Sequence, residues 1–186
     1  MGRFLVVLLV LCASVASAHE RDDRTHRRDD DALRLPMVYD AQGRPVGPLE
    51  VFSGVNGVFL PIDGATVFVE VDHKRIGPSQ YSASQYEWVG YTSVPYASHD
   101  CSGGVLVADA GSPTPAMPVR DGVDVTVYIA GDGYSGGVQV WSFRQTDSSG
   151  VTSCSATPID EGDLYWAVKR TYPLTQHYPE PLRVEY

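Results

Sequence analysis

A serine in a glycine-rich segment is the first residue whose surroundings suggest chemistry. Gly133-Tyr134-Ser135-Gly136-Gly137 fits the pattern G-x-S-x-G, in which serine hydrolases place the nucleophile between a strand and a helix. Here alternating apolar residues predict a strand on both sides, so we interpret the segment as a hairpin tip whose glycines adopt positive φ. Asp160 or Asp163 and then His177 follow in the chain order of a hydrolase triad. Because the required helix is not predicted, we expect no catalytic residue and no enzyme activity.

Residues that could bind a metal ion do not occur at the spacings of metal ligands. His73, His99 and His177 are the histidines beyond residue 34, and neither H-x-H nor H-E-x-x-H joins them. The acidic residues do not form the D-x-D-x-D-G pattern of a calcium loop. We therefore predict neither a metal site nor a cofactor.

Four aromatic residues crowd a short stretch of the chain and form the best candidate for a binding site. They are Tyr86, Trp88, Tyr91 and Tyr96. Neighbouring side chains of a strand point to opposite faces, so the four cannot all share one face. One interpretation is a core that contains cross-strand aromatic pairs. The other is an exposed platform that stacks on sugars or on the surface of a partner protein.

The first eighteen residues indicate the compartment in which these groups would work. Met1-Gly2-Arg3 gives a positive start, residues 4–15 are apolar apart from Ser14, and Ala16-Ser17-Ala18 has the small-x-small pattern of a signal-peptidase site. We expect residues 1–18 to be a signal peptide and the mature protein to be extracytoplasmic, in the periplasm or secreted. No later segment has the length and apolar character of a transmembrane helix.

Removal of the signal peptide leaves two cysteines. Cys12 leaves with the signal, and Cys101 and Cys154 remain. Two thiols in an oxidising compartment predict one disulfide, for which there is a single connectivity. The bridge would close a loop of about 50 residues and stabilise the fold by about 4 kcal/mol in the chain-entropy model.

Composition divides the mature chain into two parts. Residues 19–34 mix arginine with acidic residues and contain almost no apolar side chains, so we expect a charged, disordered leader. Residues 35–186 have the length of a single β-domain. The proline-rich stretch 111–118 is predicted to be a loop, which would separate two halves at 35–110 and 117–186.

The domain is acidic. Residues 35–186 contain 8 basic and 17 acidic residues, a formal charge of −9. Such a surface repels phosphate groups, which makes nucleic acids and anionic membranes poor partners. The partner class that remains open is a protein or a glycan.

The apolar residues of the domain recur with a period of two, which is typical of half-buried strands. Turn signals such as Asp63-Gly64 separate the runs. We predict an all-β fold, an antiparallel sandwich or a partly open barrel of about seven to nine strands with one disulfide. The alternating residues that carry this prediction are Leu35, Met37 and Tyr39; Val67, Val69 and Val71; Val123, Val125, Val127 and Ile129; and Leu164, Trp166 and Val168.

Two short segments resemble secreted bacterial β-rich proteins of unknown function. Residues 38–47 read VYDAQGRPVG, similar to the VYDAxGxxVG-like hairpin of such proteins. Residues 96–103 read YASHDCSG, similar to their YxSxDCSG-like cysteine turn. The resemblance implies a bacterial source and a structural Cys101 that pairs with a later cysteine. It implies no activity.

We therefore expect a secreted or periplasmic, non-enzymatic β-domain that serves as a structural or interaction module of the cell envelope. An alternative is a glycan- or protein-binding module that uses the Tyr/Trp patch. A further alternative is a small outer-membrane β-barrel, because Leu182, Val184 and Tyr186 alternate toward an aromatic end. The many prolines, and runs mostly shorter than the roughly nine to eleven residues of a membrane strand, disfavour the barrel.

Overall fold

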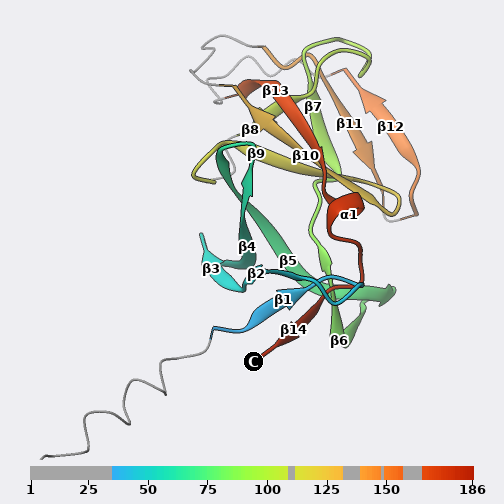
Figure 1. The fold of residues 1–186 in the computed structure, drawn as a ribbon. Helices are drawn as coiled ribbons and strands as arrows, with labels where there is room; N and C mark the ends of the chain where they lie inside the picture. The colour runs from blue at the N-terminus through green and yellow to red at the C-terminus, as the bar shows by residue number, and fades with distance from the viewer. Residues whose placement is uncertain (1–34, 109–111, 132–138, 148, 157–164) are drawn as a thin grey trace, which may run out of the picture. The chain divides into compact units, whose positions relative to one another are not determined.

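Fourteen β-strands and one helical turn are found in the computed structural model, which describes residues 35–108, 112–131, 139–147, 149–156 and 165–186 (Figure 1). The expected signal peptide and leader lie outside these residues, and Leu35–Tyr186 form one compact unit. The elements are β1 (Met37–Tyr39), β2 (Pro45–Pro48), β3 (Glu50–Phe52), β4 (Val55–Ile62), β5 (Ala65–Gly77), β6 (Gln80–Trp88), β7 (Ser93–Tyr96), β8 (Leu106–Ala108), β9 (Ala116–Asp121), β10 (Asp124–Ala130), β11 (Ser142–Thr146), β12 (Thr152–Ser155), β13 (Tyr165–Pro173), α1 (Leu174–His177) and β14 (Arg183–Glu185).

The strands pair into four antiparallel sheets. Their orders are β3-β4-β5-β6, β14-β1-β2, β8-β13-β10-β9 and β12-β11-β7. Two isolated bridges, Tyr96 with Val105 and Tyr91 with Val119, join both edges of the β8-β13-β10-β9 sheet to the chain segment that contains β7. The four strands therefore curve into a half-barrel against β7, in the upper part of Figure 1.

The predicted all-β, antiparallel and partly open architecture is confirmed. The strand count exceeds the expected seven to nine, because seven of the fourteen strands contain only three or four residues. Turns and prolines interrupt the chain often, so that some of the predicted strands are divided into shorter ones.

Strand β5 shows how the alternation builds the core. Val67, Val69 and Val71 are buried and belong to the larger apolar cluster of the unit. The hairpin that joins β4 to β5 turns at Asp63-Gly64, as predicted, and both residues have positive φ. A two-residue turn of this kind matches the twist of the two strands and fixes their register.

Strand β10 contributes to two cores at once. Val125, Val127 and Ile129 pack into the larger cluster with β5, whereas Ala130 belongs to a second buried cluster inside the half-barrel. The predicted alternation is thus confirmed from Val125 onward. Val123, expected in the same strand, lies in the β9–β10 turn and is 81% exposed.

Two further details of the sequence prediction are wrong. The buried residue of β1 is Val38, whereas Leu35, expected to begin the core, is exposed. Residues 116–118, expected to be loop, begin strand β9. The carbonyl of Pro118 faces away from β10 and accepts the Tyr91 N–H at 2.8 Å. The ring nitrogen points to the same side as the carbonyl, so the missing N–H of proline costs no hydrogen bond to β10.

The predicted disulfide between Cys101 and Cys154 is present and joins the turn after β7 to β12. The turn is fixed by Ser142, a fully buried residue of β11 whose Oγ donates to the Ser98 carbonyl at 2.6 Å and accepts the Cys101 N–H at 3.0 Å. Ser98 Oγ in turn accepts the Gly103 N–H at 2.8 Å. Disulfides are typical of proteins in oxidising compartments outside the cytoplasm.

Within the described ranges, no helix combines the length and the apolar character needed to cross a bilayer.

Candidate functional site

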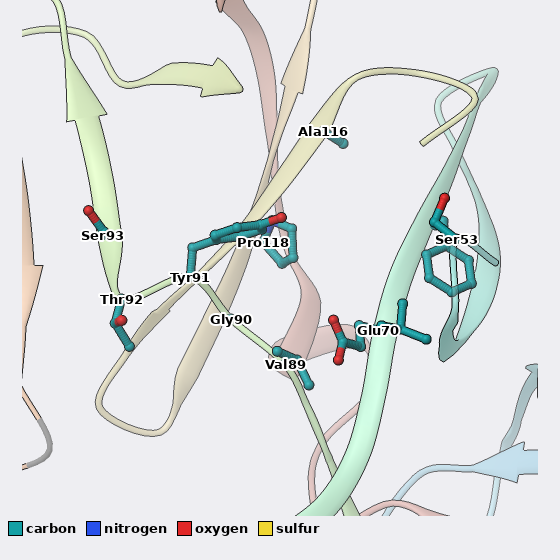
Figure 2. Close-up of a pocket in the computed structure, with 11 residues that line it drawn as sticks. Ser53, Glu70, Val89, Gly90, Tyr91, Thr92, Ser93, Ala116 and Pro118 are labelled. Carbon is teal, nitrogen blue, oxygen red and sulfur yellow. The ribbon is translucent and has the colours of Figure 1, made fainter. Parts of the chain in front are cut away.

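A cleft of about 480 Å³ opens between β5 and the segment that leads from β6 into β7 (Figure 2). Apolar, aromatic, hydroxyl and carboxylate groups line it together. The side chains that matter for its chemistry are Ser53, Val55, Phe68, Glu70, Tyr91 and Pro118.

The alternation along β5 places one wall of the cleft. Because Val67, Val69 and Val71 point into the core, the intervening Phe68 and Glu70 point to the opposite face of the strand. Both are half-buried. The same period of two that builds the core therefore also presents an aromatic ring and a carboxylate side by side.

Main-chain hydrogen bonds place the opposite wall. The Val89 N–H donates to the Glu70 carbonyl at 2.9 Å, and the Tyr91 N–H donates to the Pro118 carbonyl at 2.8 Å. The segment thus bridges β5 and β9, and Figure 2 shows the Tyr91 ring beside Pro118. Tyr91 remains 44% exposed, so its ring is accessible from solvent.

A cluster of three phenylalanines supports the wall on β5. The ring centroids of Phe52, Phe59 and Phe68 lie 5.0–5.3 Å apart in tilted and edge-to-face arrangements. Gly57, on β4, makes room for them, because a Cβ at this position would lie 2.4 Å from Cζ of Phe68. The ring of Phe68 is therefore packed against two other aromatic rings.

The described lining of the cleft contains one carboxylate, that of Glu70. Burial raises the pKa of the Glu70 carboxyl above its usual range, and repulsion from Asp72 raises it further. Burial and the charge of Glu70 likewise raise the pKa of the Tyr91 phenol. Among the described residues Glu70 has no ion pair and no side-chain hydrogen bond. A partly desolvated anion of this kind favours a ligand that brings a compensating charge or donor.

The structure separates the four aromatic residues expected to form a platform. Trp88 is fully buried and donates its Nε1–H to the Tyr178 carbonyl at 3.0 Å. Tyr96 is buried in the half-barrel core, and Tyr86 stacks on His73 with ring centroids 4.4 Å apart. Tyr91 alone of the four lines the cleft.

The described residues give little support to a catalytic or a metal-binding site. The Gly133–Gly137 segment, with Ser135, lies outside them, as do Asp160 and Asp163. His177 stacks on Tyr172 with ring centroids 4.3 Å apart. In the described ranges no three His, Cys, Asp or Glu side chains gather as a metal site would require.

A second cavity, of about 590 Å³, lies beside Arg120 and Glu180, and the charges of these two residues are used by the fold. Glu180 pairs with Arg120 at 2.7 Å and accepts the Trp88 N–H at 2.7 Å, while Arg120 donates to the Trp88 carbonyl. These groups hold β6, β9 and the segment before β14 together. The cleft at Glu70 is therefore the better candidate for binding.

Comparison of the chain with protein-family models, with curated proteins and with solved structures finds no match. The assignment of the site consequently rests on its geometry. Sequence reasoning singled out Tyr91 but missed Phe68, Glu70 and Pro118. For the first two, the alternation of 67–72 was the available signal, since it assigns a ring and a carboxylate to the face opposite the valines.

Proposed function

We propose that the chain is an extracytoplasmic, non-enzymatic interaction module, periplasmic or secreted, that binds its partner through the cleft between Glu70 and Tyr91. The observation that carries the proposal is a cleft whose rings are accessible and whose carboxylate serves no interaction within the described fold. Clefts that combine apolar walls with a few convergent polar groups are the usual form of binding sites.

Two features together support an extracytoplasmic compartment. The Cys101–Cys154 disulfide favours an oxidising environment. The expected signal peptide over residues 1–18 would deliver the chain to such an environment. The acidic surface directs the choice of partner away from nucleic acids.

The absence of catalysis is part of the proposal. Glycoside hydrolysis normally uses two carboxylates that flank the scissile bond, and the described lining of the cleft supplies one. A fluorophosphonate probe tests the remaining serine-hydrolase hypothesis. We expect no labelling, and covalent modification of Ser135 would overturn the non-enzymatic assignment.

Binding is tested by NMR titration of the exported, ¹⁵N-labelled protein with neutral oligosaccharides and with short peptides of differing charge. We expect at least one probe to shift the amide signals of residues 68–70 and 89–92. Tyr91→Ala should abolish these shifts, whereas Tyr81→Ala, which removes a ring 57% exposed on β6, should not. If no probe perturbs these amides, the cleft is not a binding site and the module is purely structural.

A further inference from the structure

The charge of the Glu70–Tyr91 cleft restricts the chemistry of its ligand. Of the described residues that line it, Glu70 alone carries a formal charge at neutral pH. Figure 2 shows its carboxylate directed from β5 towards the segment that contains Val89 and Tyr91. An anionic ligand would meet this carboxylate without a compensating cation, so the cleft disfavours anions.

Two other partly or fully buried carboxylates of the domain are paired with arginine. Asp40 is paired with Arg44 and Glu180 with Arg120, each at 2.7 Å. Glu70 is half-buried without such a pair in the described part of the chain, and the nearby Asp72 repels it. A cation placed in the cleft would relieve both the desolvation and the repulsion.

The aromatic rings of the cleft suit the same kind of ligand. Phe68 lies on the same face of β5 as Glu70, Tyr91 lines the cleft from the segment between β6 and β7, and the ring of Phe68 packs against Phe52 and Phe59. The faces of aromatic rings attract cations, and alkyl chains pack against them. A group with an apolar stem and a positive end matches these walls and this carboxylate.

We propose that the cleft binds an alkylammonium group, with the stem between Phe68 and Tyr91 and the ammonium donating to the Glu70 carboxylate. The inference rests on the proposed function and names the chemistry of its ligand. Lysine side chains and small alkylamines both carry this group. The excess of acidic over basic residues on the domain would attract such cations from a distance and speed their association.

The test uses three probes in NMR and calorimetric titrations of the exported protein. They are Gly-Lys-Gly, 1,5-diaminopentane and Gly-norleucine-Gly, with both peptides N-acetylated and C-amidated, so that the norleucine peptide keeps the side-chain stem without any ammonium. We expect an ammonium probe to shift the signals of residues 68–70 and 89–92 and to bind about 10-fold or more tightly than the norleucine peptide. The affinity should fall with added salt. Binding of the tripeptide alone would identify a polypeptide as the source of the lysine, and binding of the diamine would identify a small amine.

Glu70→Gln keeps the shape of the side chain and removes its charge. We expect this variant to lose the preference for ammonium over norleucine, while Glu185→Gln, which removes the same charge outside the cleft, retains it. Equal affinities of the lysine and norleucine peptides, or an unchanged preference in Glu70→Gln, would overturn the inference and leave the proposed function intact. If no probe in this set or in the neutral panel perturbs the cleft, both proposals fail together.

Discussion

Asp40 and Asp147 begin two turns of the same construction, one in the β1–β2 hairpin and one in the β11–β12 hairpin. In each turn the aspartate Oδ1 accepts the N–H two residues ahead at 2.8 Å and the N–H four residues ahead at 2.9 Å. A glycine with positive φ, Gly43 or Gly150, follows three residues after the aspartate. The two turns differ in burial, because Asp40 is fully buried and Asp147 is exposed.

This difference predicts unequal costs for the same substitution. Asp40→Ala would remove a buried acceptor from three part-buried hydrogen bonds, one of them from Nε of Arg44, and should destabilise the fold by about 3 kcal/mol. Asp147→Ala frees donors that water can reach, so its cost should be clearly smaller. Urea unfolding of both variants measures the difference. Equal losses would mean that burial of the first turn does not determine its contribution.

The disulfide is expected to form in the exported protein and to contribute to its stability. Alkylation without reductant, followed by intact-mass analysis, should detect no free thiol at Cys101 or Cys154. Replacing both residues with serine should lower the free energy of unfolding by about 2–4 kcal/mol, since the bridge constrains a long loop in the unfolded chain. Two alkylated cysteines in a correctly exported sample would contradict the pairing.

Glu70 is expected to reduce the stability of the protein at neutral pH. Its folded-state pKa is raised, so the folded state binds a proton more readily than the unfolded state does, and stability is lost as pH rises through the folded pKa. Glu70→Gln should therefore raise Tm by about 1–2 °C at pH 7.

The gain should disappear below about pH 4.5, the ordinary pKa of the group, where Glu70 itself is protonated in both states. Calorimetry at several pH values follows this change. Glu185→Gln, at an exposed carboxyl on β14, should leave Tm within a degree of the wild type at each pH. A loss of stability in Glu70→Gln at pH 7 would show that the carboxylate makes a stabilising contact.

Two glycines provide a matched test of the phenylalanine cluster. A Cβ at Gly57 would lie 2.4 Å from both Phe68 Cζ and the Val69 carbonyl oxygen, so Gly57→Ala should cost about 1–3 kcal/mol through forced displacement of strand and ring. A Cβ at Gly104 meets no atom within 4 Å, and Gly104→Ala should change stability by less than about 0.5 kcal/mol. Thermal unfolding compares the two variants. Similar melting temperatures would indicate that Phe68 is free to move, which would weaken the case for a preformed wall.

Local patterns predicted the parts of the fold that depend on neighbouring residues. Two of these parts are the alternation of Val67, Val69 and Val71 and the turn at Asp63-Gly64, which depend on residues close together in the sequence. The disulfide could be predicted because two cysteines allow only one pairing. The face of β1 was assigned wrongly because three residues define no reliable period. Its burial is decided by pairing with β2 and β14, which bury Val38.

The candidate site depends on contacts that no local pattern reports. Glu70, Tyr91 and Pro118 meet because separate hydrogen bonds attach one segment to both β5 and β9. Trp88 shows a second limitation of sequence patterns, because an aromatic residue in a stretch of mixed polarity is compatible with both a surface and a core position. It is buried in the larger apolar cluster, and the Tyr178 carbonyl, 90 residues away in sequence, accepts its indole N–H.

The pairing of β1 with β14 has a consequence for the order in which the domain assembles. Met37 lies opposite Glu185, so the first described strand obtains one of its two neighbours from a segment made almost 150 residues later. Until β14 pairs with it, β1 has an unpaired edge. The loop that must close to bring β14 to this edge is among the longest in the chain. Contacts of this separation slow folding. The β14-β1-β2 sheet is therefore expected to form late, and a stalled or truncated chain would expose β1 to pairing with other molecules.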